Sequence, residues 1–164
     1  MKTKLIELFE KVQAIPYRCR SEEFSYSGIM PPYANCNQKR NILRILLDNE
    51  GFESRDLDAV FDWKDLPIPE EILKILRNSG TQQKHHLLEI RINEYYLRID
   101  PTWNPELRER NFPVTEDWKG ESDTQQITNG KIRFYNPALE KISLPYFPQE
   151  REEFAREFNR WLDW

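Results

Sequence analysis

Apolar residues recur at the spacing of an amphipathic helix in three parts of the chain. The first part spans residues 2–14, and Pro16 follows it as a helix breaker. The second starts at residue 36 and stops before Gly51, and the third covers residues 148–164. We therefore expect three helices, each of which turns an apolar face toward the core.

The second of these helices begins at a cysteine. Asn35 is a good N-cap, Gln38 lies where the partner in a capping box would be, and Gly51 is placed for a left-handed C-cap. Cys36 is then the first helical residue, where unpaired backbone N–H groups and the positive end of the helix dipole favour a thiolate, the nucleophilic state of cysteine. The alternative is that Cys36 is a small apolar residue without a chemical role.

Residues 84–103 alternate in the manner of two strands joined by a tight turn. Two runs rich in aliphatic and aromatic residues flank Asn93-Glu94, which predicts a hairpin with a two-residue loop. In that register Ile92 faces Tyr95, and opposite charges face each other on the polar side of the hairpin. The predicted core face carries Leu88, Ile90, Ile92, Tyr95, Leu97 and Ile99.

The hairpin register also separates two adjacent histidines. It pairs Leu87 with Asp100, and it pairs His85 with Thr102. His85 then shares a face with Asp100, whereas His86 points to the apolar face. A histidine and an aspartate placed in this way form either a surface ion pair or a catalytic base with its orienting acid.

A nucleophilic cysteine needs a base to accept its proton and a third group to orient that base. Cys36, His85 and Asp100 could fill these roles, and they occur in that order along the chain. The sequence therefore predicts a Cys-His-Asp triad between the start of a helix and two strands. A structural Cys36 beside a chance hairpin is the alternative.

The remaining segments give weaker signals. Helical and strand-like patterns occur together and are separated by turn residues, which predicts an α+β fold. The expected features are a short strand or exposed turn at residues 58–63, a helix near residues 70–78 ended by Gly80, an irregular segment at residues 105–126, and short strands at residues 131–135 and 141–144.

Composition narrows the class of protein. The 164 residues predict a single domain, residues 1–164, and with 13% aromatic residues the rings must supply much of the core volume. Charged residues make up 32% of the chain with a net charge of −4, and no basic stripe indicates a nucleic-acid partner. The tryptophans expected in the core are Trp63, Trp103, Trp118, Trp161 and Trp164.

The N-terminal residues and the cysteines bear on the compartment. The sequence has no signal-peptide pattern and no apolar run near the roughly 20 residues of a membrane span, so we predict a cytoplasmic protein without a membrane partner. In that compartment Cys19 and Cys36 should stay thiols. No metal-ligand cluster or phosphate-binding loop is evident, so no metal or other cofactor is expected. The oligomeric state is left open.

Cys36 with its helix, followed by the segment HHLLEIRINEYYLRIDPTW, resembles the transglutaminase-like superfamily of papain-like cysteine folds. In that superfamily a histidine, a glutamate four residues later, a hairpin and an Asp-Pro-Thr-Trp ending typically follow the cysteine. The resemblance covers residues 33–103 and implies a papain-like core in which the nucleophile helix packs on an antiparallel sheet. It also implies that Cys36 attacks an amide carbonyl of a peptide or protein, that His85 moves the proton, and that Asp100 orients the imidazole.

The resemblance does not decide between hydrolysis and amine transfer, and it does not identify the second oxyanion donor. If water resolves the acyl-enzyme the protein is a peptidase or amidase, and if an amine does so it is transglutaminase-like. No tryptophan precedes Cys36, whereas the true transglutaminases use such an indole as an oxyanion contact. The Cys36 N–H could supply one oxyanion donor, and Tyr17, Tyr33 and Asn35 are candidates for the second. The missing tryptophan also motivates an alternative in another class, an inactive binding or scaffold module with the same fold.

Overall fold

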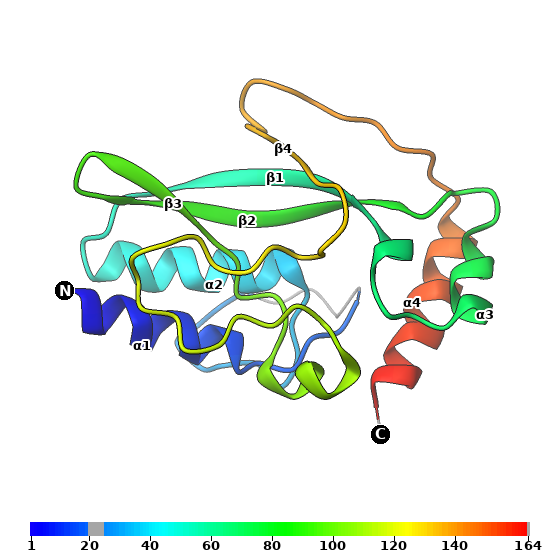
Figure 1. The fold of residues 1–164 in the computed structure, drawn as a ribbon, viewed down its shortest axis with the longest axis horizontal. Helices are drawn as coiled ribbons and strands as arrows, with labels where there is room; N and C mark the ends of the chain where they lie inside the picture. Colours follow the sequence, from blue (N-terminus) through cyan, green and yellow to red (C-terminus); the bar gives the residue numbers. More distant parts are fainter. Residues whose placement is uncertain (20–24, 164) are drawn as a thin grey trace.

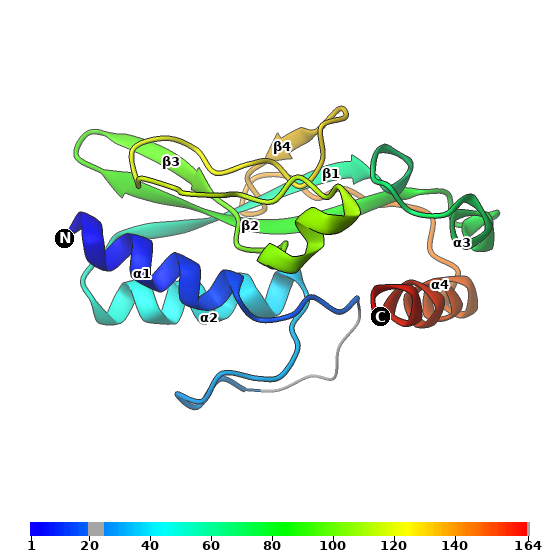
Figure 2. The same ribbon diagram turned by 60° about the horizontal axis from the view of Figure 1, so that its bottom comes forward.

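The computed structural model describes residues 1–19 and 25–163 and has an α+β architecture. Two helices, α1 and α2, lie against one face of an extended sheet, and α3 and α4 lie together at one end of it (Figures 1 and 2). No helix formed by the described residues is both long and apolar enough to cross a membrane. The helices are α1 (Lys2–Gln13), α2 (Cys36–Asn49), α3 (Glu70–Leu73) and α4 (Pro148–Leu162), with 3-10 turns at Trp63–Asp65, Lys74–Leu76 and Pro105–Arg110.

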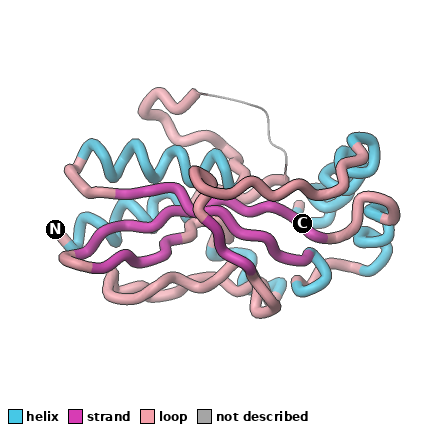
Figure 3. The backbone as a smooth tube through the Cα atoms, turned by 90° about the horizontal axis from the view of Figure 1, so that it is seen from above, coloured by secondary structure: helices cyan, strands magenta, loops and turns pink. Residues whose placement is uncertain are grey.

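The strands of the described residues form one antiparallel sheet in the order β3-β2-β1-β4 (Figure 3). Their bounds are β1 (Ser54–Asp62), β2 (Gln82–Ile92), β3 (Tyr95–Ile99) and β4 (Arg133–Tyr135). The two long strands, β1 and β2, are central. Their register places Ala59 opposite His85 and Asp58 opposite His86.

The predicted hairpin register is confirmed over the length of β3. Ile92 pairs with Tyr95 and Leu88 pairs with Ile99, while Asn93 has a φ of 56° in the tight turn. The ladder of described pairs ends there, so the two pairs predicted beyond Ile99 do not form. Pro101 contributes to this, because it has no N–H to donate to a ladder. The Asp100 N–H instead donates to Thr124 Oγ1 at 2.9 Å.

The predicted caps of α2 are confirmed. Asn35 Oδ1 accepts from the Gln38 N–H, and Gln38 Oε1 accepts from the Asn35 N–H, both at 2.9 Å, which is a complete capping box. Gly51 follows the helix with a φ of 79°, a left-handed conformation that glycine adopts without steric cost. Cys36 is thereby fixed as the first residue of α2.

The core consists of two large apolar clusters. One lies between α1, α2 and the β2–β3 hairpin, where Leu88, Ile90 and Ile99 are fully buried. The other is aromatic and lies between α4 and the sheet end; the predicted packing face of α4 is confirmed, because Phe154, Phe158 and Leu162 are buried in it. Among the tryptophans expected in the core, Trp63, Trp103 and Trp118 are buried, Trp161 is half-buried, and Trp164 lies outside the described residues.

Three weaker expectations are corrected. Of the short strand or exposed turn expected at residues 58–63, the strand forms, but it is longer: residues 58–62 complete the central strand β1, and Trp63 starts a 3-10 turn. Apolar Leu57, Ala59 and Phe61 alternate in β1 with acidic residues that pair with basic side chains. The helix expected at residues 70–78 is a short α3 followed by a 3-10 turn. In the C-terminal half of the described chain, β4 forms as expected but residues 141–144 form no strand.

Candidate active site

Cys36 lies at the N-terminus of α2 next to the imidazole of His85. The capping box at Asn35 sets the direction in which the helix starts, and the Cys36 side chain is half-buried. A hydrogen bond with the Cys36 side chain is one of the interactions that raise the pKa of His85. The structure therefore brings together the cysteine and the histidine that the sequence analysis selected.

His85 is bonded on its other side to Asp100. His85 Nε2 lies 2.6 Å from Asp100 Oδ2, and the two residues are only 2% and 7% exposed. Because a carboxylate can only accept a hydrogen bond, Nε2 carries the hydrogen and Nδ1 is the nitrogen left for Cys36. This fixed tautomer is what a base acting on a thiol requires.

Asp100 is held in place by two threonines. The Thr102 N–H and hydroxyl donate to Asp100 Oδ1 at 3.1 and 2.5 Å, and Thr124 Oγ1 accepts from the Asp100 N–H. Both carboxylate oxygens therefore have partners, one on His85 and one on Thr102. The sequence analysis missed these supports, because an Asp-Pro-Thr turn shows its hydrogen bonds only once the turn is folded.

Burial and the partners of His85 act on its pKa in opposite directions. Burial alone lowers the pKa of the imidazole, but the Asp100 carboxylate and the hydrogen bonds to Asp100 and Cys36 outweigh it and raise the pKa of His85 to about 10. These partners therefore favour the imidazolium, which is the form that His85 takes once it has accepted the proton of Cys36. An imidazolium beside a thiol at a helix start is an arrangement that stabilises a thiolate–imidazolium pair.

A pocket of about 170 Å³ opens at these side chains. Cys36 and His85 line it together with the rings of Tyr17, Phe61, Trp63 and Trp103. Beside His85, the edge of β2 is free of β3, because the ladder between them stops at Leu88. The reactive atoms thus face a small cavity with aromatic walls, which suits an amide group better than a large rigid ligand.

The three oxyanion candidates differ in their position. Tyr17 lines the pocket, and burial first of all, together with the charges of Cys19 and Cys36, raises the pKa of its hydroxyl, which therefore stays a hydrogen-bond donor. Asn35 also lines the pocket; its Oδ1 accepts a hydrogen bond in the helix cap, so its Nδ2 is the side-chain atom that could donate to an oxyanion. Tyr33 is 40% exposed, lies 3.9 Å beneath the guanidinium of Arg18, and is not among the residues that line the pocket. The geometry thus leaves Tyr17 and Asn35 as candidates and sets Tyr33 aside.

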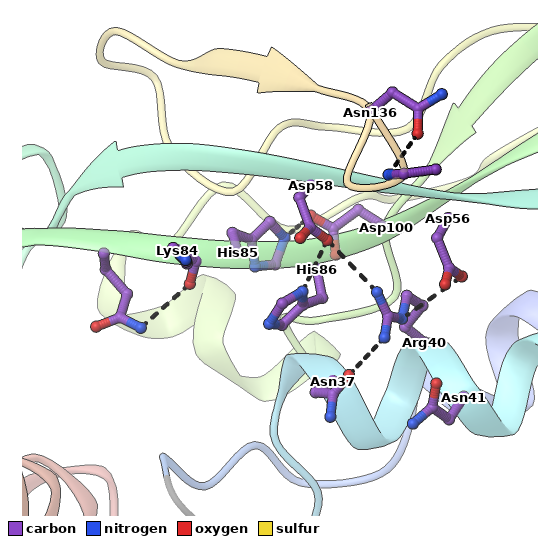
Figure 4. Close-up of polar contacts among 12 residues, drawn as sticks. Asn37, Arg40, Asn41, Asp56, Asp58, Lys84, His85, His86, Asp100 and Asn136 are labelled. Carbon is purple, nitrogen blue, oxygen red and sulfur yellow. Dashed lines mark hydrogen bonds and ion pairs between the residues drawn. The ribbon is translucent and has the colours of Figure 1, made fainter. Parts of the chain in front are cut away.

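A second histidine–aspartate pair lies at the same pocket. His86 Nδ1 is 2.8 Å from Asp58 Oδ1, and the His86 side chain is 29% exposed (Figure 4). His86 lies on the same face of β2 as Leu88, as predicted, but its neighbours there are polar. The sequence signal for this pair was the alternation of acidic residues in β1, which places Asp58 directly across from His86.

A buried lysine lies in α2, about one helical turn after Cys36. Lys39 is fully buried, and its Nζ donates to the carbonyl oxygens of Gln13, Pro101 and Thr102 at 3.1, 3.2 and 2.9 Å. Burial lowers the pKa of Lys39 to about 7, against the opposing charges of Asp100 and Glu106. Lys39 thus joins the end of α1, the nucleophile helix and the turn after Asp100.

Comparisons with known proteins give no relative whose site could guide the interpretation, which therefore depends on the geometry. No family model, no curated protein and no solved structure matches the chain. Within residues 1–19 and 25–163, no group of three or more histidine, cysteine, aspartate or glutamate side chains is arranged to hold a metal ion. The arrangement that can carry chemistry is the pocket with Cys36, His85 and Asp100.

Proposed function

We propose that the protein is a thiol acyl-transfer enzyme of the transglutaminase-like, papain-like type that acts on an amide of a peptide or protein. One observation carries the proposal. Cys36 starts a helix beside an imidazole whose far nitrogen is hydrogen-bonded to the buried Asp100, and both the thiol and the imidazole line one pocket. This is the constellation that activates a cysteine for attack on a carbonyl.

The arrangement of elements supports the same assignment. The nucleophile helix α2 packs on an antiparallel sheet, the histidine lies on β2, and the aspartate directly follows β3. A papain-like core would present the three groups from such a helix and from neighbouring strands. The resemblance of residues 33–103 to the transglutaminase-like superfamily therefore agrees with where these elements lie.

The reaction would proceed in two stages. The Cys36 thiolate attacks the amide carbon, and the imidazolium of His85 gives its Nδ1 proton to the departing amine as the C–N bond breaks. The product of this stage is a thioester on Cys36. In the second stage water or an amine attacks the thioester carbon, a histidine at the pocket accepts the proton of the attacking group, and Cys36 leaves as a thiolate.

Two donors are available for the oxyanion of the tetrahedral intermediate. The N–H of Cys36 belongs to the first turn of α2, where backbone N–H groups lack helical partners. The hydroxyl of Tyr17 is the second donor, because Tyr17 lines the pocket and its raised pKa keeps it protonated; it would turn to the oxyanion from Cys19, with which its side chain is hydrogen-bonded. Tyr17 would thus take the place of the tryptophan that is missing before Cys36.

Hydrolysis is favoured over amine transfer. Water is present at about 55 M and needs no dedicated acceptor site, whereas an amine acceptor has to be positioned. The test is a peptide library assayed with and without a primary amine, with Cys36→Ala as the control. Amine-independent release of product supports a peptidase or amidase, and incorporation of the amine supports a transglutaminase. A library that yields no product with wild-type protein would instead support the inactive binding module.

A further inference from the structure

The pocket of Cys36 is served by two histidine–aspartate pairs, and the proposed triad uses only one of them. Adjacent residues of β2, His85 and His86, carry these pairs, and both line the pocket. Their settings differ. His85 is 2% exposed and lies between Cys36 and Asp100, whereas 29% of the His86 side chain is open to solvent.

The carboxylate that holds His86 is well anchored. Asp58 is 7% exposed and accepts from His86 Nδ1 and from Arg40 Nη1 at 3.4 Å, and the hydroxyl of Tyr135 also bonds to it. Burial raises the pKa of Asp58, but the hydrogen bond and charge of His86 and the charge of Arg40 outweigh it and lower the value. A buried carboxylate with three donors is a fixed acceptor rather than a mobile surface group.

The cluster is tied to the nucleophile helix. Arg40 belongs to α2, and its Nη2 donates to Asn37 Oδ1 at 2.7 Å. Asn37 directly follows Cys36 and lines the same pocket as His86. Figure 4 shows His86 on the side of β2 that faces Asn37 and Arg40. The second pair is therefore held in a set position relative to the thiol.

The bond to Asp58 also selects the tautomer of His86. The carboxylate accepts, so Nδ1 carries the hydrogen and the neutral ring keeps its lone pair on Nε2. His85 has the opposite arrangement, with Nε2 bonded to Asp100 and Nδ1 toward Cys36. His85 thus presents Nδ1 to the pocket beside the Cys36 sulfur, whereas His86 presents Nε2 on the solvent-exposed side.

We propose that His86 is a second general base, which activates the water that resolves the Cys36 thioester. The water oxygen bonds to the thioester carbon, the water proton passes to His86 Nε2, and the C–S electron pair returns to Cys36 as the thiolate. His86 then releases the proton to solvent, and His85 takes up a proton from solvent, which restores the imidazolium beside the Cys36 thiolate. Asp58 acts as a positioning residue that holds the hydrogen on Nδ1 and leaves Nε2 as the nitrogen directed at the pocket. The inference rests on the proposed function and assigns its second stage to a residue outside the triad.

The test separates the two stages with p-nitrophenyl acetate, an activated ester that acylates a reactive thiol. The burst of p-nitrophenol reports acylation, the slower steady phase reports loss of the acetyl group, and mass spectrometry locates that group. We expect His86→Ala to keep the burst at Cys36 within twofold and to slow the steady phase about 100-fold, the usual range for a general base. Added imidazole should restore much of the lost rate, and Asp58→Asn should also slow only the second phase.

Arg44→Gln is the matched control, because it removes a 2.7 Å bond between α2 and Asp56 of β1 without touching His86. Both phases should stay within twofold of wild type in this variant. An unchanged second phase in His86→Ala, or equal slowing of both phases without rescue by imidazole, would overturn the role of His86 and leave the triad intact. Absence of the burst in the wild-type protein would overturn the proposed function itself.

Discussion

His85 and Asp100 form a buried ion pair in which Nε2 and Oδ2 lie 2.6 Å apart, although the strand that leads to Asp100 ends before it. The contact depends on the turn at Pro101, which takes the chain out of the sheet and lets Thr102 bond back to the same carboxylate. Substitutions at and around this pair should therefore change the activity, the thiol reactivity and the stability of the protein in ways that can be measured.

Asp100→Asn should reduce any acyl-transfer activity by about 10³- to 10⁴-fold, because the amide no longer stabilises the imidazolium or selects its tautomer. The pKa of His85 should fall from about 10 toward its ordinary value, since the charge of Asp100 is what raises it. NMR titration of the imidazole carbons measures this change. An unaltered pKa in the folded variant would show that Asp100 does not control His85.

Cys36 should react with iodoacetamide faster than Cys19 at about pH 6.5. His85 is hydrogen-bonded to the Cys36 side chain and can accept its proton, whereas Cys19 lines the pocket but is not part of the proposed triad. Mass-spectrometric mapping of the alkylated peptides gives both rates in one experiment. His85→Ala should remove the difference. Equal labelling of the two cysteines in the wild-type protein would contradict an activated thiol.

Tyr17→Phe should lower kcat by about 100-fold and leave KM nearly unchanged, because an oxyanion donor acts on the transition state rather than on the bound substrate. The Tyr17 N–H keeps its 2.9 Å bond to Asn104 Oδ1 in this variant, so the backbone support of the site remains. Tyr33→Phe is the matched control, since Tyr33 does not line the pocket. Equal kcat in wild type and Tyr17→Phe would remove Tyr17 from the oxyanion site.

Lys39→Met should change the pH dependence of stability. The pKa of Lys39 is about 7 in the folded protein, and its ordinary value of 10.5 applies to the unfolded chain. Between these two pH values the unfolded chain therefore binds more protons than the folded one. The contribution of Lys39 to stability is therefore lowest below about pH 7 and rises as the pH goes from about 7 toward 10.5. Urea unfolding from about pH 6 to 9 should show the wild-type advantage over Lys39→Met growing with pH. A difference that is flat or shrinks would contradict a neutralised buried lysine.

The sequence alone predicted the features that depend on interactions between residues close together in the chain. Alternation across Asn93-Glu94 predicted the hairpin register, and the capping residues predicted the start of α2 at Cys36. The register also predicted that His85 and Asp100 share a face, although their contact forms through the turn at Pro101 and not through the ladder. These features depend on residues that are neighbours in the chain or across one turn, where propensity and burial act in the same direction.

The missed features depend on contacts between distant segments. The carbonyl partners of Lys39 come from the end of α1 and from the turn after Asp100, and no pattern near Lys39 predicts its burial. The acidic residues of β1 resembled those of an exposed turn, because the arginines of α2 that pair with them were not visible as neighbours. The role of His86 was hidden for the same reason, since Asp58 meets it only when β1 pairs with β2.

Acyl-enzyme formation tests the central claim most directly. The protein is mixed with a peptide-amide library, quenched in acid within a single turnover, digested, and analysed by mass spectrometry for acylated peptides. The account predicts a thioester on the peptide that contains Cys36, its absence in Cys36→Ala, and a much lower yield in His85→Ala. A reactive Cys36 that carries no acyl group with any member of the library would contradict the acyl-transfer assignment.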